Sequence, residues 1–120
     1  MATLLNVLTN NKAGVFLLLF LAAGLEALGD SFFQSGLHRA VGLGRALPFL
    51  AGALSLTTYG LVVNLAPWDF GKLLGIYVVV FFIAAQAIAW LRFSQVPDLR
   101  IVLGGFFILV GGAIMSWGRL

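Results

Sequence analysis

The sequence predicts an all-α membrane protein that crosses the bilayer as four helices. Of its 120 residues, 62% are hydrophobic and only 9% are charged, and the mean hydropathy is +1.09. A soluble domain needs a polar shell and carries about a quarter charged residues, so this chain would expose apolar patches and aggregate in water. Four apolar segments each have the roughly 17–25 residues that a helix needs to cross the hydrocarbon core. We therefore expect one four-helix transmembrane domain, residues 1–120, in a lipid bilayer.

The four spans are expected at about residues 13–37, 46–65, 73–91 and 101–117. Helices are favoured over strands because the apolar runs are long and lack the ~10-residue alternation of an outer-membrane barrel. In the second span, Pro48 falls in the first turn, where a missing N–H costs little.

Residues at the edges of the spans fit a membrane interface. The connections are short and contain glycine, proline and charged residues, which mark turns. Trp68, Trp90 and Trp117 fall near predicted helix ends, where an interfacial aromatic belt would place them. Before the first span, four apolar residues are compatible with a short interfacial turn or with a frayed terminus: Leu4, Leu5, Val7 and Leu8.

The basic residues that flank the spans are almost balanced between the two sides of the membrane. The side that holds both termini carries three and the other side carries four: Lys12, Lys72 and Arg119 against Arg39, Arg45, Arg92 and Arg100. Because orientation follows the Lys/Arg excess, two readings stay open. The chain inserts both ways round, or it has a fixed orientation with a modest preference for an outside N-terminus.

Composition argues against several classes of function. The chain has no cysteine, which excludes disulfides and thiolate metal sites. It has one histidine, His38, at a predicted helix end, and no metal-ligand spacing, so we expect neither an enzyme nor a bound cofactor or metal. The net charge of +3 comes without a basic patch interleaved with aromatic residues, and we therefore expect no nucleic-acid partner.

Glu26 is the main candidate for a functional residue. It lies about a dozen residues from either end of the first span, where an ionised carboxylate costs a few kcal/mol. Such a residue persists when it faces a protein interior or a wet cavity, or when it is protonated for part of the time, because burial disfavours its charged form. A carboxyl group in this position can exchange a proton for a cation. The structural alternative is a carboxyl group that only hydrogen-bonds a neighbouring helix.

Three further residues are candidates for the same proton or substrate site. Asp30 lies one turn after Glu26 on the same helix face; it could bind a proton or cation together with Glu26, or simply pair with Arg39 or reach water. Tyr59 and Tyr77 could line a cavity and contact a cation through their rings. They could equally be ordinary hydrogen-bonding residues between helices.

The fourth span contains two glycine pairs, Gly104-Gly105 and Gly111-Gly112, seven residues apart and therefore on one side of a helix. Small residues are the usual contact surface between membrane helices because they allow the backbones to approach closely. The spacing leaves open whether this contact is within the chain or between two chains.

Several short motifs occur in a defined order along the chain. They are Leu25-Glu26-Ala27-Leu28-Gly29, Thr58-Tyr59-Gly60-Leu61-Val62, Leu65-Ala66-Pro67, Phe70-Gly71-Lys72, Tyr77, Trp90 and Pro97-Asp98. Over about residues 13–118 this order resembles the YnfA family, small four-helix proteins related to the small multidrug resistance group of the drug/metabolite transporter superfamily. The chain departs from the family pattern at Lys72, where arginine is usual, at Val78-Val79, where two glycines are usual, and in the additional acid Asp30.

The resemblance implies a dual-topology, antiparallel homodimer in the inner (plasma) membrane of the cell, exporting small cationic drugs or guanidinium-like compounds against protons. Glu26 would then be the shared proton and substrate site, and Gly104/Gly111 or Gly105/Gly112 the dimer contact. Tyr59 and Tyr77 match tyrosines of the pattern. The alternative function is a non-transporting small subunit that packs against a larger membrane complex, and in that case Glu26 would be hydrogen-bonded and dry rather than facing a cavity.

Overall fold

The computed structural model describes residues 2–39 and 41–117, and these form helices and turns without a strand. The elements in chain order are α1 (Ala2–Thr9), α2 (Lys12–His38), the 3-10 helix η1 (Gly42–Arg45), α3 (Ala46–Val63), α4 (Phe70–Phe93) and α5 (Leu99–Ser116). Four helical segments are long and apolar enough to cross a membrane: Lys12–His38, Gly42–Val63, Phe70–Phe93 and Leu99–Ser116. The predicted all-α, four-span fold is confirmed.

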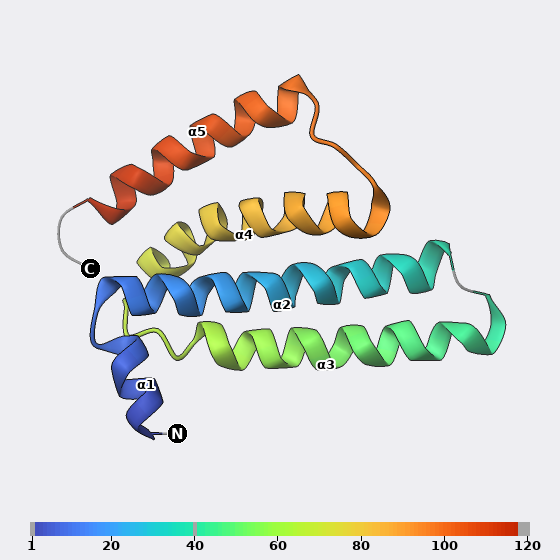
Figure 1. The fold of residues 1–120 in the computed structure, drawn as a ribbon, viewed down its shortest axis with the longest axis horizontal. Coiled ribbons are helices and arrows are strands. Elements are labelled where there is room, and N and C mark those ends of the chain that lie inside the picture. The colour runs from blue at the N-terminus through green and yellow to red at the C-terminus, as the bar shows by residue number, and fades with distance from the viewer. Residues whose placement is uncertain (1, 40, 118–120) are drawn as a thin grey trace.

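Helix α2 is the centre of the arrangement. It lies between α3 and α4 and contacts both. Helix α5 packs mainly on α4 and leans away from α2 and α3 (Figure 1), and its last residue, Ser116, accepts a hydrogen bond from Lys12 of α2 at 3.4 Å. Helix α1 and the C-terminal end of α5 lie at the same end of the bundle, as an even number of spans requires (Figure 1).

Capping residues set several helix ends away from the hydropathy boundaries. The side chain of Asn11 accepts a hydrogen bond from the Gly14 N–H at 2.7 Å, and that of Asp98 accepts one from the Ile101 N–H at 2.9 Å. Each side chain satisfies an N–H group that the first turn leaves without a partner, so α2 and α5 begin before the predicted residues 13 and 101. Helix α3 ends at Val63, two residues before the predicted end at Leu65, and the Asn64 side chain donates to the Gly60 carbonyl at 2.8 Å.

The buried core lies where α2 meets α4 and the end of α3. Its members are small or aliphatic side chains and one tyrosine: Val15, Leu18, Leu19, Ala22, Ala23, Val63, Ala66, Leu73, Ile76, Tyr77 and Val80. Helices α2 and α3 approach closely at Gly52, where an added Cβ would lie 3.0 Å from the Gly29 carbonyl oxygen and 2.8 Å from the Phe33 ring. This approach fits the small-residue contacts that are usual between membrane helices.

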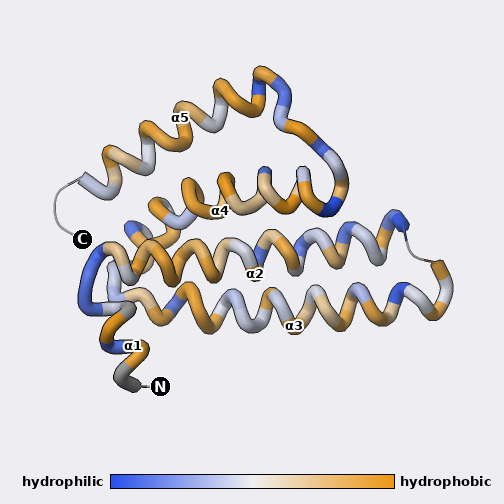
Figure 2. The backbone as a smooth tube through the Cα atoms, viewed as in Figure 1, coloured by the Kyte–Doolittle hydropathy of each residue, from blue (hydrophilic) through white to orange (hydrophobic). Residues whose placement is uncertain are grey.

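The outward faces of the helices are apolar. Large side chains such as Leu54, Leu61 and Phe107 are about 70% exposed, at 71%, 69% and 71%. Hydrophobic residues cover most of each long helix, and hydrophilic residues lie toward the turns and along the second half of α2 (Figure 2). In a bilayer the exposed faces contact lipid tails, which explains how so few charged residues are sufficient.

The edges of the spans agree with an interface. Trp90 and Trp117 are 60% and 82% exposed, near the ends of α4 and α5. Of the two readings of the N-terminal segment, the structure shows a short helix, α1, with Leu4 and Val7 exposed. The side chains of Leu5 and Leu8 are outside the described part of the structure, as is Arg119.

Candidate functional site

The carboxyl group of Glu26 is hydrogen-bonded across the bundle. The Tyr77 hydroxyl, on α4, donates to Glu26 Oε1 at 2.9 Å. Tyr77 is 4% exposed and belongs to the core, so packing fixes the position of its hydroxyl group. The Tyr59 ring, on α3, stacks on the Tyr77 ring with centroids 5.7 Å apart and planes at 29°. Three helices therefore meet at Glu26.

Glu26 also lines a cavity of about 260 Å³. The other lining residues are aromatic or aliphatic: Tyr59, Leu74, Tyr77, Val78 and Phe81. The Tyr59 hydroxyl has no hydrogen-bond partner among the described residues. A carboxylate surrounded by aromatic rings can hold an organic cation, because charge attraction and the negative ring faces act together.

Asp30 lies in a separate cavity of about 300 Å³, toward the C-terminal end of α2, together with Ser31, Gln34 and Gln95. It is exposed and makes no hydrogen bond or ion pair among the described residues. The pairing with Arg39 considered as an alternative is not formed, and the Arg39 guanidinium stands instead over the Phe93 ring at 4.4 Å. Glu26 and Asp30 share a helix face, but each faces its own cavity.

Phe81 connects the two cavities and did not stand out in the sequence. Its side chain lines both of them, and its ring lies 6.2 Å from that of Tyr77. The signal that could have identified it is spacing, since Phe81 follows Tyr77 by four residues and so lies on the same face of α4.

The glycine pairs on α5 divide into two sets. Gly105 and Gly112 are buried against α4: an added Cβ would lie 2.5 Å from the Phe82 ring at Gly105 and would overlap Val79 at Gly112. At Gly104 and Gly111 an added Cβ would meet nothing within 4 Å. One glycine of each pair thus packs inside the chain, and the other is open to a further partner.

Comparison with known proteins decides the family. A profile described as "Uncharacterised BCR, YnfA/UPF0060 family" matches residues 15–119. The chain belongs to the YnfA/UPF0060 family. The resemblance seen in the motifs is thereby confirmed.

Relatives of this YnfA/UPF0060 protein match over most of their length. The UPF0060 membrane protein YfjF of Bacillus subtilis (strain 168) is 33% identical over 103 residues, covering 84% of this chain and 92% of that protein. A UPF0060 membrane protein of Herpetosiphon aurantiacus is 33% identical over 105 residues, covering 84% and 93%. No solved structure matches the chain. With four apolar spans and relatives named membrane proteins, this is a multi-pass membrane protein.

One departure of this YnfA/UPF0060 chain from the family pattern lies beside the site. Val78 lines the Glu26 cavity, and Val79 packs against Gly112 of α5. Where the pattern has two glycines, the two valines therefore supply a cavity wall and a contact that holds α5 to α4.

Proposed function

We propose that this protein is a proton-coupled exporter of small cationic compounds in the inner (plasma) membrane, and that Glu26 carries the exchange. The observation on which the proposal rests is the position of the Glu26 carboxyl group. It lies midway along α2 and lines a cavity of about 260 Å³ with aromatic walls. An ionisable residue inside a membrane is by default a candidate for an ion or substrate pathway.

The chemistry follows from one carboxyl group with two competing ligands. When ionised, Glu26 attracts a cation, and the Tyr77 hydroxyl stabilises the charged form by donating to Oε1. When protonated, Glu26 loses that attraction and the cation leaves. Binding sites for drug-sized ligands are about 300–1,000 Å³, so the smaller cavity of about 260 Å³ favours small cations.

A second copy of the chain is part of the proposal. Helix α5 packs mainly on α4 and leaves Gly104 and Gly111 open. Small residues on an unoccupied helix face suit close contact with another helix. An antiparallel homodimer joined through α5 would bring two Glu26 residues into one transporter, as the family resemblance implies.

The test is transport in proteoliposomes with a panel of small organic cations and an imposed pH gradient. Wild type should move at least one cation in exchange for protons, with weaker apparent affinity as pH falls between about pH 6 and 8. Glu26→Gln keeps the shape and removes the exchangeable charge, so it should abolish coupled transport while the protein still folds. Asp30→Asn is the matched control, because Asp30 lies outside the Glu26 cavity. It should alter affinity or specificity without abolishing exchange.

The alternative function is a small subunit that packs against a larger membrane complex. Glu26 is hydrogen-bonded to Tyr77, as such a subunit would have it, but it also lines a cavity. The cavity favours the transporter, since a packing subunit has no use for open space beside its carboxyl group. If Glu26→Gln moves cations as well as wild type, with unchanged pH dependence, the transporter proposal is wrong and the subunit takes its place.

A further inference from the structure

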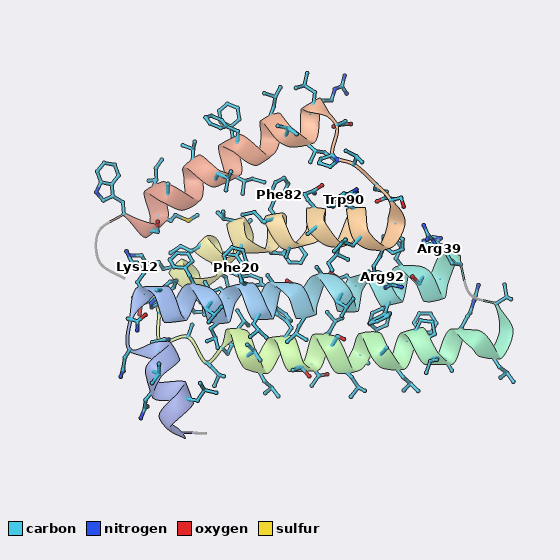
Figure 3. All side chains as sticks on the ribbon, viewed as in Figure 1. Lys12, Phe20, Arg39, Phe82, Trp90 and Arg92 are labelled. Atoms are coloured by element: carbon cyan, nitrogen blue, oxygen red, sulfur yellow. The ribbon has the colours of Figure 1, made fainter. Side chains whose placement is uncertain are left out.

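Two arginines meet at one aromatic ring where α2 and α4 end. Arg39 caps the C-terminus of α2, and its guanidinium carbon lies 4.4 Å from the centroid of the Phe93 ring. Arg92 is in the last turn of α4, and its guanidinium carbon lies 5.5 Å from the same centroid and 4.6 Å from that of Phe32. Figure 3 shows both arginines near the same end of the bundle.

Hydrogen bonds fix the Arg92 side chain across α2. Its Nη1 donates to Ser31 Oγ at 2.6 Å and its Nη2 donates to Ser35 Oγ at 3.3 Å. Ser31 is 5% exposed and its hydroxyl donates in turn to the Leu28 carbonyl at 2.6 Å. These hydrogen bonds give the Arg92 guanidinium a defined position instead of letting it move freely toward water. Because a guanidinium has five N–H donors, donors remain for a further ligand.

Neither guanidinium has an anionic partner. Within residues 2–39 and 41–117, no carboxylate forms a hydrogen bond or ion pair with Arg39 or Arg92. Asp30 lines the neighbouring cavity with Phe93, without contacting either arginine. Two positive charges held beside one ring repel each other, and an anion bound between them would relieve that repulsion. Guanidinium groups match the geometry of phosphate oxygens especially well.

The depth of the two arginines favours an anion of the membrane. Helix α2 has 27 residues and is therefore ~40 Å long, against a hydrocarbon core of about 30 Å. Measured along the axis of α2 from its midpoint, Ser31 and Ser35 lie ~9–15 Å away and Arg39 lies ~21 Å away. This range covers the boundary between lipid tails and headgroups.

We propose that Arg39 and Arg92, held on Phe93, bind the phosphate of an anionic membrane lipid. Arg92 contacts the phosphate from the bundle side and Arg39 from the headgroup side. The site is separate from the Glu26 cavity, so it stands whether or not the exporter proposal holds.

The experiment measures lipid selectivity by electron spin resonance. Protein in phosphatidylcholine vesicles receives a trace of spin-labelled phosphatidylglycerol or, in parallel, spin-labelled phosphatidylcholine. The fraction of each label that the protein immobilises gives a selectivity ratio. A basic residue near the membrane surface attracts anionic lipid by about 1 kcal/mol, or about fivefold. Wild type should therefore prefer phosphatidylglycerol, and Arg39→Gln and Arg92→Gln should each lower the ratio at the occupied site by about that factor.

Controls separate this site from general surface charge. Arg100 lies at the start of α5 on the same side of the membrane and is exposed, so Arg100→Gln removes only diffuse surface charge and should lower the ratio less than either Arg39→Gln or Arg92→Gln. Arg39→Gln leaves the hydrogen bonds of Arg92 to Ser31 and Ser35 intact. If Arg92→Gln does not fold, Arg39→Gln alone tests the proposal. Inorganic phosphate at matched ionic strength should leave the ratio unchanged.

Three results would overturn the proposal. The first is an unchanged ratio in both Arg39→Gln and Arg92→Gln, or in Arg39→Gln alone if Arg92→Gln does not fold. The second is an equal loss in Arg100→Gln, which would indicate diffuse surface charge. The third is loss of the preference in inorganic phosphate, which would assign the arginines to a soluble anion instead of a lipid.

Discussion

Replacing Tyr77 with phenylalanine tests the hydrogen bond at the centre of the candidate site. The change removes one oxygen atom, the donor to Glu26 Oε1 at 2.9 Å. The phenylalanine ring keeps the stacking on Tyr59, whose centroid lies 5.7 Å away, and it keeps the core packing. Among the described residues, Glu26 then has no side-chain hydrogen-bond donor, so the loss is confined to one interaction.

The expected magnitude follows from measured hydrogen-bond energies. Bonds to charged groups contribute about 1.5–3 kcal/mol in soluble proteins, whereas side-chain bonds between membrane helices average about 0.6 and reach about 1.7 kcal/mol. We take about 1 kcal/mol for Tyr77. Because the hydroxyl stabilises the ionised carboxylate, its loss favours the protonated form. At pH values where Glu26 is mainly protonated, cation affinity should fall about fivefold, and the pH of half-maximal cation binding should rise by ~0.7 units.

Binding of the best cation from the transport panel, titrated by calorimetry between about pH 6 and 8, measures both quantities. Tyr59→Phe is the matched control, because the Tyr59 hydroxyl has no hydrogen-bond partner among the described residues, and it should bind as wild type does. A Tyr77→Phe protein with the wild-type pH profile, or with a midpoint moved to lower pH, would refute this account of how Tyr77 acts on Glu26.

Four further predictions concern assembly, the packing of the single chain, topology and the carboxylate. Leucine at Gly104 or Gly111 should weaken the dimer in cross-linking experiments without disturbing the single chain, and an unchanged oligomer with both substitutions would exclude this dimer face. Alanine at Gly105 or Gly112 should instead destabilise the single chain by about 1–3 kcal/mol through overpacking, seen as a lower unfolding temperature. Reporters fused to the C-terminus should register populations on both sides of the membrane, and a lysine or two added to one side should fix the orientation; a wild-type protein found only one way round would remove the dual-topology argument. Glu26→Asp should retain part of the transport activity with a changed pH optimum, since a carboxyl group remains but is set back by about one methylene; a wild-type pH profile would count against direct proton exchange there.

The fold could be predicted from the sequence because a bilayer imposes a length and an apolar composition on every span. The exact ends of the helices could not be predicted, since hydropathy does not detect capping hydrogen bonds. The 3-10 helix η1 and the early end of α3 at Val63 depend on local backbone geometry. The N-cap hydrogen bonds of Asn11 and Asp98 use polar residues outside the apolar runs.

Only part of the candidate site could be predicted from the sequence. Glu26 was identifiable because a charge in mid-membrane has a known cost. Tyr77 was a candidate for the same site, but its hydrogen bond to Glu26 could not be predicted, because the two residues lie 51 positions apart and no local rule pairs them. Periodicity placed the glycine pairs on one side of α5, but adjacent residues differ by about 100° around a helix. Only the packing of α4 shows that Gly105 and Gly112, and not their neighbours, face inward.

Helix α5 contributes nothing to the lining of the candidate site. Every residue that lines the Glu26 cavity comes from α2, α3 or α4, and α5 packs mainly on α4, with one hydrogen bond from Lys12 of α2 to its last residue. The outer face of α5 can therefore change in sequence without touching the carboxyl group or its tyrosines. If α5 pairs two copies as proposed, this face is free to acquire new pairing preferences, and gene duplication can then yield two chains that recognise each other while both keep the Glu26 cavity.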